Sequence, residues 1–172
     1  MKKINILLII CILICFPDIS LSARQYTQSA FSPSPDAVNL IQRNINNAKK
    51  NIYIAAYSFS SAKVSDALIN AHKRGVKVQV LLDKTNVGKR TYPAVEALYR
   101  AGIPVRINRK YAIMHNKYII IDKITVQTGS FNFTASAEKR NAENVIVIRN
   151  NPALAKRYLT NWKKLWDEGE EY

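Results

Sequence analysis

Hydrophobic and polar positions alternate with two different periods along this chain. Between residues 35 and 167, apolar residues three and four apart form amphipathic helical stretches, and shorter, nearly continuous apolar runs are typical of buried strands. The helical pattern covers about 35–50, 60–75, 92–101 and 152–167, and the strand pattern covers about 51–57, 76–82, 104–107, 115–122, 125–128 and 144–148. This alternation predicts an α/β fold, in which helices flank both faces of a mixed, largely buried β-sheet.

Residues with known capping preferences mark several of these boundaries. Pro35 is typical of a first helical turn, Ser60 and Ser61 of a helix N-cap, and Gly75 of a helix end. His72 lies near the end of the same helix, where a capping or surface role is expected and a catalytic role is not.

The first 22 residues have the composition of an export signal. Two lysines precede an almost wholly apolar run over residues 4–16, and small serines follow near position 22. The run is shorter than the roughly 20 residues that span a bilayer, so cleavage is favoured over a membrane anchor. The sequence therefore predicts a signal peptide over 1–22 and a single domain over 23–172. It also predicts a periplasmic or secreted location, without stable membrane association after cleavage.

Charge and cysteine content narrow the possible partners. The chain carries 26 basic and 12 acidic residues, a net charge of +14. This excess favours a polyanionic partner, for which nucleic acid and anionic lipid both qualify. Both cysteines lie in the predicted signal peptide, so the domain would be held together by its core, without disulfides.

Residues 114–132 read MHNKYIIIDKITVQTGSFN and contain the candidate chemistry. Their functional positions follow the spacing His-x-Lys-x4-Asp-x6-Gly-Ser-x-Asn, namely His115, Lys117, Asp122, Gly129, Ser130 and Asn132. A neutral imidazole can attack phosphorus, and a lysine beside it can offset the charge on the non-bridging oxygens. Serine and asparagine side chains can donate to the same oxygens, while glycine allows the backbone a close approach. The set suits cleavage of a phosphodiester without a metal or cofactor.

This spacing resembles the signature of the phospholipase D superfamily at every fixed position from His115 to Asn132. The resemblance implies a phospholipase D-like α/β sandwich and hydrolysis through a covalent phosphohistidine. Members usually carry two copies of the motif, whereas this chain has one. The resemblance therefore implies a homodimer with two-fold symmetry, in which two copies of His115 face each other.

Two carboxylates are further candidate members of the site. Glu143 follows the motif at a place where related enzymes carry a glutamate, which implies that it orients His115 by accepting from the imidazole. A solvated loop acid is the alternative for Glu143. Asp122 belongs to the catalytic set by spacing, but it lies an odd number of residues from His115 and Lys117. On a straight strand it would face away, so a supporting role is expected.

The substrate class is predicted from the surrounding residues. Basic pairs in loops or at helix ends could follow a phosphate backbone, namely Lys89-Arg90, Arg109-Lys110 and Lys139-Arg140. Aromatic residues could stack on unpaired bases, namely Tyr92, Tyr111 and Phe131. Ser58, Phe59 and Ser60 could border the pocket. No base-reading module is evident, so a sequence-non-specific endonuclease is expected, acting on double- and single-stranded DNA. An RNA endonuclease and a phospholipase D or cardiolipin-type phosphodiesterase are the alternatives.

Overall fold

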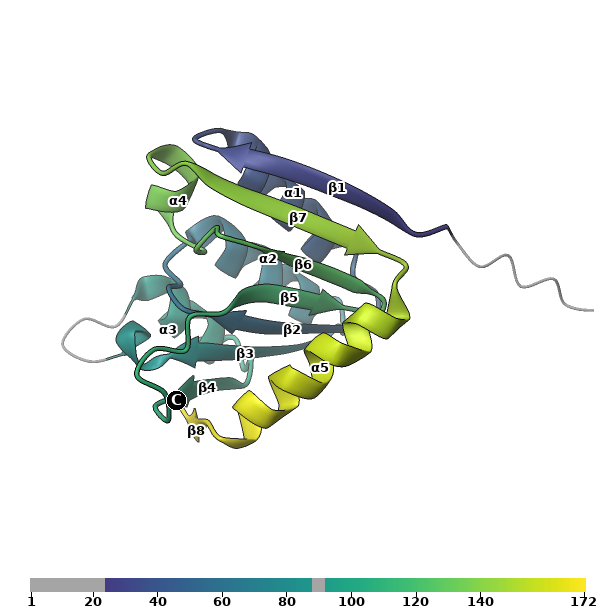
Figure 1. Ribbon diagram of the computed structural model, residues 1–172. Helices are drawn as coiled ribbons and strands as arrows, with labels where there is room; N and C mark the ends of the chain where they lie inside the picture. Colours follow the sequence, from purple (N-terminus) through teal and green to yellow (C-terminus); the bar gives the residue numbers. More distant parts are fainter. Residues whose placement is uncertain (1–23, 88–91) are drawn as a thin grey trace, which may run out of the picture.

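The computed structural model describes residues 24–87 and 92–172, and the sheet at its centre has eight strands in the order β1-β7-β6-β5-β2-β3-β4-β8 (Figure 1). The predicted signal peptide and Lys89-Arg90 lie outside the described residues. The strands are β1 (Tyr26–Ser32), β2 (Asn51–Ala56), β3 (Lys77–Asp83), β4 (Val105–Asn108), β5 (Lys117–Ile121), β6 (Thr125–Gly129), β7 (Glu143–Arg149) and β8 (Glu170–Glu171). The helices are α1 (Pro35–Asn47), α2 (Ala62–Lys73), α3 (Pro93–Arg100), α4 (Ala135–Lys139) and α5 (Pro152–Asp167), with a short 3-10 turn at Lys84–Asn86.

The sheet is mixed, as the sequence predicted. Strands β2, β3 and β4 are parallel, and β5, β6, β7 and β1 continue the sheet through antiparallel pairs. Helices α2 and α3 connect the parallel strands, because a parallel pair needs a crossover connection. Parallel β2, β3 and β4 therefore end at the same edge of the sheet, which is where β5 begins.

Each face of the sheet has its own hydrophobic core. On one face, residues of β2 and β3 such as Ile54 and Val80 pack against α1, α2 and α3. On the other face, Tyr53, Leu81 and Tyr118 pack against the inner side of α5. Helix α5 crosses this second face diagonally (Figure 1). Burial on both faces explains the nearly continuous apolar runs of the central strands.

Three elements and one strand boundary differ from the sequence-based expectation. Strands β1 and β8 and the short helix α4 were not predicted. The predicted strand over 115–122 begins only at Lys117, so His115 precedes the strand. The backbone before β5 bonds elsewhere, since Met114 N–H donates to the Asp83 carboxylate (2.7 Å) and Asn116 C=O accepts from Tyr57 N–H (2.8 Å).

None of the helices in the described ranges combines the length and apolarity needed to span a bilayer.

Candidate active site

The motif residues meet at the edge of the sheet where β2 ends and β5 begins. Ala56, the last residue of β2, pairs with Lys117 at the start of β5. Gly129, the last residue of β6, pairs with Val145 near the start of β7. Because β5 and β6 form one antiparallel hairpin, the first and last parts of the motif return to the same edge.

His115 presents an exposed imidazole at this edge. Its ring lies against the ring of Tyr57, with centroids 4.4 Å apart and planes inclined by 56°. Within the described part of the chain, neither ring nitrogen of His115 has a hydrogen bond or ion pair. The nitrogens are therefore open to a substrate or a second protein chain.

Lys117 lies beneath this histidine and is buried. Its ammonium donates to the His115 carbonyl (2.8 Å) and lies 5.2 Å from the centre of the Tyr57 ring. Removal of this ammonium from water lowers the pKa of Lys117 below its usual range, and the nearby Glu143 carboxylate partly opposes that effect. A cation held largely out of water is suited to pair with a phosphate oxygen.

Ser130 and Glu143 form a hydrogen-bonded pair beside Lys117. The Ser130 hydroxyl donates to Glu143 Oε2 (2.5 Å) and accepts from Asn144 N–H (3.0 Å). The other carboxylate oxygen accepts from the Asn141 amide (3.0 Å). Glu143 therefore holds Ser130 and Asn141, and the expected bond from His115 to Glu143 is absent within one described protomer.

Gly129 is required by its surroundings. Its φ is +149°, and a Cβ at this position would lie 2.1 Å from the Asn144 carbonyl oxygen. This close approach lets Ser130 N–H donate to the same carbonyl (3.1 Å). Glycine here brings the β7 backbone against the motif, as the sequence suggested.

Asn132 is half-buried and incompletely paired. Its side-chain oxygen is buried without a hydrogen-bond partner among the described residues. A buried polar atom of this kind is uncommon in folded proteins. The side chain is thus available for a ligand or for a group from outside the protomer.

Asp122 lies beyond the far end of β5, away from the histidine. Its carboxylate accepts from three successive backbone N–H groups, those of Lys49 (2.9 Å), Lys50 (2.7 Å) and Asn51 (3.0 Å). It therefore fastens the β5–β6 hairpin to the start of β2. The geometry supports the expected supporting role and gives Asp122 no part at the reacting edge.

Comparison with known proteins agrees with this geometry. Residues 41–166 match the family model described as cardiolipin synthase, PLD-like domain. The chain belongs to the phospholipase D superfamily. It is accordingly a phosphodiesterase of the hydrolase class.

Similar proteins carry two kinds of name. A protein named phospholipase D from Rickettsia conorii is 48% identical over 145 residues, which cover 84% of this chain and 72% of that protein. A mitochondrial cardiolipin hydrolase from Xenopus laevis is 32% identical over 143 residues, or 83% and 64% of the two chains. The crystal structure of Nuc, a phospholipase D family member from Salmonella typhimurium, is 39% identical with a TM-score of 0.82, covering 87% of this chain and 99% of that one.

The basic and aromatic residues proposed to contact substrate are only partly free for that role. Arg109 is 3.2 Å from Glu170, and Lys110 is 2.8 Å from Glu168. Phe131 is 1% exposed, so its predicted stacking on a base is wrong. The two tyrosines suggested for stacking, Tyr92 and Tyr111, are half-buried against the core clusters.

Three residues outside the phospholipase D motif shape the site and were not identified from sequence. Asp83 is fully buried and fixes the loop before His115 through Met114 N–H. Asn86, also fully buried, donates to the Tyr57 carbonyl (2.6 Å) and accepts from Phe59 N–H (2.8 Å). Tyr57 contacts the imidazole itself. The position of Tyr57 and Asp83 at strand ends was an available signal, because ligands of α/β sheets bind there. Asn86 had no comparable signal.

Residues 58–60 border the site through the backbone. Phe59 forms an isolated bridge with Phe133, and Ser60 and Ser61 N–H groups donate to the Phe133 carbonyl (2.8 and 2.9 Å). Ser61 also caps α2 by accepting from Val64 N–H. These bonds fix the loop that carries Asn132.

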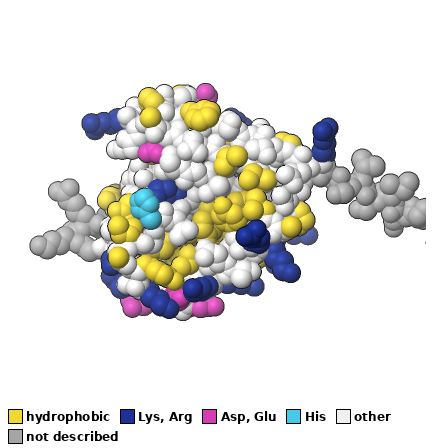
Figure 2. Space-filling view, viewed as in Figure 1, with side chains coloured by type: hydrophobic (Ala, Val, Ile, Leu, Met, Phe, Trp, Pro, Cys, Tyr) yellow, Lys and Arg dark blue, Asp and Glu magenta, His cyan; other side chains and the backbone are white. Residues whose placement is uncertain are grey.

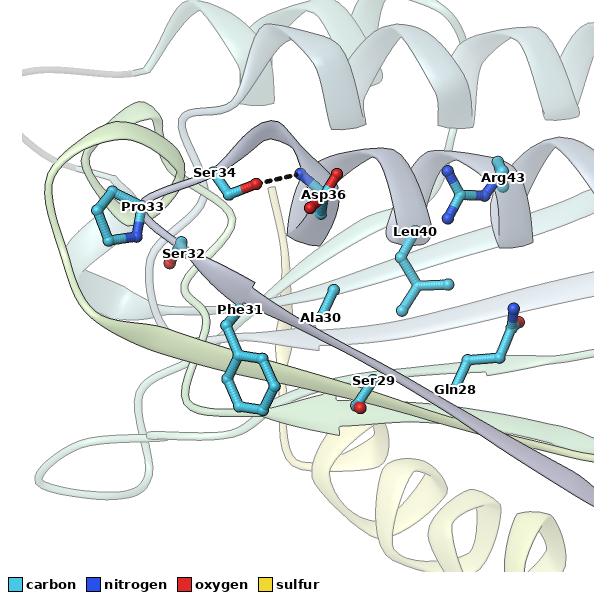
Figure 3. A pocket seen from close by; sticks show the side chains of 10 residues that line it. All are labelled: Gln28, Ser29, Ala30, Phe31, Ser32, Pro33, Ser34, Asp36, Leu40 and Arg43. Atoms are coloured by element: carbon cyan, nitrogen blue, oxygen red, sulfur yellow. Dashed lines mark hydrogen bonds between the residues drawn. The ribbon is translucent and has the colours of Figure 1, made fainter.

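Among the hollows of the described surface, one borders the motif and another of similar size lies away from it. A groove of about 520 Å³ beside Asn116 is lined by Tyr118, Leu154, Arg157, Tyr158 and Asn161. A second hollow, of about 540 Å³, lies between β1 and α1 and contains no motif residue (Figure 3). In the ranges that the structure describes, no three His, Cys, Asp or Glu side chains are grouped as metal ligands would be.

Proposed function

We propose that this chain is a metal-independent, sequence-non-specific endonuclease that hydrolyses DNA through a phosphohistidine on His115. The active site would be shared across a homodimer. The observation that carries the proposal is the gathering of His115, Lys117, Ser130 and Asn132 at one exposed edge, where the imidazole nitrogens have no hydrogen-bond partner among the described residues. The similarity to Nuc over 87% of the chain supports the nuclease reading.

The reaction we propose needs two imidazoles. His115 attacks phosphorus and forms a P–N bond, while the P–O bond to the leaving strand breaks. The partner's His115 gives its proton to the leaving oxygen, and then accepts a proton from water. The water oxygen attacks phosphorus, and the P–N bond breaks to regenerate the enzyme. Lys117 and Asn132 of both protomers stabilise the charge of the five-coordinate states. Ser130, now donating to Glu143, lies beside them as a further donor.

Two surface features support a homodimer. The protomer contributes one histidine to the edge, whereas attack and leaving-group protonation call for two. Hydrophobic side chains gather in a band on the face that carries α5 (Figure 2), and half-buried Leu154, Tyr158 and Leu159 of this helix pack there. On the same face of the sheet, Phe31 of β1 is 65% exposed. A second copy would cover this surface.

A mixing experiment tests the shared site. Wild-type and His115→Ala chains are refolded together at varied ratios, and nicking is measured per total protein. If one site uses both imidazoles, activity falls as the square of the wild-type fraction. A linear fall, or a monomer in sedimentation under active conditions, would overturn the shared site.

The function itself is tested by plasmid nicking in excess EDTA. The parent protein is expected to nick, and His115→Ala is expected to lose the activity. His72→Ala is the matched control because it removes the other histidine, half-buried near the end of α2. Loss of activity in EDTA would contradict a metal-independent mechanism.

Lipid hydrolysis is the second candidate, and one structural observation favours it. Ile113, two residues before His115, is 53% exposed, so an apolar side chain lies close along the chain to the reacting edge. Relatives named phospholipase D and cardiolipin hydrolase add to this candidate. The same preparation should be assayed on plasmid DNA, RNA and cardiolipin vesicles. Release of phosphatidic acid with no nicking would replace the nuclease proposal.

A further inference from the structure

Tyr57 is the residue that holds the His115 imidazole in place. The two ring centroids are 4.4 Å apart, and this contact is the only one of its kind made by the His115 side chain in the described residues. The Lys117 ammonium lies 5.2 Å from the centre of the same tyrosine ring. Tyr57 therefore packs against both the proposed nucleophile and the cation beside it.

The Tyr57 backbone is fixed on both sides. Its N–H donates to the Asn116 carbonyl (2.8 Å), which lies between His115 and Lys117 in the sequence. Its carbonyl accepts from the amide of the buried Asn86 (2.6 Å), whose side-chain oxygen accepts in turn from Phe59 N–H (2.8 Å). The Tyr57 ring is thus attached to a backbone that is held by hydrogen bonds on both sides, as a residue that positions another side chain requires.

We infer that Tyr57 is a positioning residue, which orients the His115 imidazole through ring contact. The inference rests on the proposed role of His115 in catalysis. Within the protomer, the contact that faces the imidazole is this ring and not Glu143, whose carboxylate is bound to Ser130 and Asn141.

Orientation by a ring differs chemically from orientation by a hydrogen bond. A carboxylate that accepts from one imidazole nitrogen fixes the tautomer and occupies that nitrogen as a hydrogen-bond donor. A tilted aromatic ring restricts the imidazole plane without occupying a nitrogen. In a symmetric dimer, the same residue must act as nucleophile in one protomer and as acid in the other. Ring contact restrains the imidazole plane in both protomers and commits neither histidine to one role.

Kinetics of two matched variants test the inference. Tyr57→Leu removes the ring, and Tyr57→Phe keeps the ring but loses the hydroxyl. Because a misplaced reacting group can cost about 100-fold in rate, we expect kcat of Tyr57→Leu to fall by about that factor with KM nearly unchanged. Tyr57→Phe should retain most of the activity. Tyr99→Leu, at an exposed tyrosine of α3, controls for loss of an aromatic side chain.

A spectroscopic measurement separates positioning from general damage to the fold. The chain has two histidines, so ring carbon relaxation of His115 and His72 can be followed together. In Tyr57→Leu, the His115 ring is expected to gain motion while the His72 ring does not. If Tyr57→Leu fails to fold, Tyr57→Met replaces it, since methionine is also ringless and adapts to irregular gaps.

The outcomes distinguish this inference from the proposed function. Full kcat and an ordered His115 ring in the ringless variant would overturn the role of Tyr57, as would equal loss in Tyr57→Phe. Full nicking by His115→Ala would instead overturn the proposed function.

Discussion

Gly129 and Gly75 both have positive φ angles, but they differ in what surrounds them. At Gly75, φ is +88° and a Cβ would meet nothing within 4 Å, so Gly75→Ala should cost only the conformational penalty, about 1–2 kcal/mol. At Gly129, a Cβ would also meet the Asn144 carbonyl oxygen at 2.1 Å. We expect Gly129→Ala to cost about 3 kcal/mol or more in the free energy of unfolding, together with activity.

Urea denaturation of both variants measures this difference. Equal losses of unfolding free energy in the two variants would show that the backbone at Asn144 can shift without an energetic penalty. The close approach of Asn144 would then not explain the glycine in the motif.

The depressed pKa of Lys117 predicts the alkaline side of the pH profile. Burial disfavours its charged form, so the cation is lost at a lower pH than in an ordinary lysine, whose pKa is 10.5. Activity that depends on this cation should therefore fall before pH 10.5 is reached. Glu143 raises the pKa of Lys117, so in Glu143→Gln the fall should begin at a still lower pH. The measurement is kcat/KM against pH, with exposed Glu171→Gln as control.

A lower rate of Glu143→Gln would not affect this test, because the midpoint is read from the shape of the profile. A midpoint that stays in place or moves to higher pH would contradict the interaction between Glu143 and Lys117.

Among single residues, the motif was predictable because it is nearly local. His115, Lys117, Ser130 and Asn132 lie on or beside one hairpin, so their spacing already brings them to one edge. Tyr57, Asp83 and Asn86 come from other parts of the chain and reach the site only through the order of strands. Phe131 was misassigned because its neighbours in sequence are polar, whereas the loop turns its ring into the core.

At the scale of elements, Asp122 holds a hairpin to a strand. Asp122→Ala would leave three backbone N–H groups without their charged acceptor, and should cost about 1.5–3 kcal/mol of stability. Because these bonds are remote from the reacting edge, kcat of the folded variant should stay close to the parent value. Thermal unfolding and nicking assays of the same preparation measure both effects.

Asp66→Ala, at an exposed carboxylate of α2, is the matched control for the Asp122 variant. A large loss of kcat in well-folded Asp122→Ala would return Asp122 to the catalytic set.

The central elements followed from the sequence, while the peripheral ones did not. Strands β2 and β3 are buried on both faces and therefore read as continuous apolar runs. Strand β1 buries only Ala30 and Ser32, and its remaining side chains are exposed or half-buried. Strand β8 has two glutamates and exists through its pairing with β4. Such strands form because they pair with distant strands, and the local pattern of apolar and polar residues does not indicate that pairing.

At the scale of the whole molecule, the C-terminal segment fastens the loop that leads to the active site. Glu168 accepts from Lys110 (2.8 Å) and from the Tyr111 hydroxyl (2.9 Å). The bond from Lys110 lowers the pKa of Glu168, and the same pair raises the pKa of Lys110. The acidic end of the chain is thus part of the fold.

The pKa shifts of Glu168 and Lys110 predict the pH range over which the bond between them stabilises the protein. A carboxylate with a lowered pKa stabilises the folded state above its ordinary value of 4.5, and that contribution is lost as pH falls through the folded pKa. A lysine with a raised pKa stabilises below its ordinary value of 10.5, and loses this contribution as pH rises through the folded pKa. Glu168→Gln should therefore lower Tm between these limits and have less effect outside them.

Tm measured from pH 3 to 11 tests this contact. Glu171→Gln is the control, since its carboxylate is 89% exposed and lies 3.9 Å from Arg106. A Glu168→Gln loss that does not vary with pH would show that packing, and not charge, joins the segment to the loop.

The placement of Asp122 shows that the motif spacing also fixes a distance along the sheet, between the two ends of β5. Strand β5 has five residues, Lys117–Ile121, and each residue advances the strand by about 3.3 Å. The length of β5 therefore sets the distance between Lys117 at the reacting edge and Asp122 at the start of β2. Adding or removing one residue would carry one end out of place and turn the later side chains to the other face. The four residues between lysine and aspartate are all buried in the core and fixed in number, which makes their count as informative as the named positions.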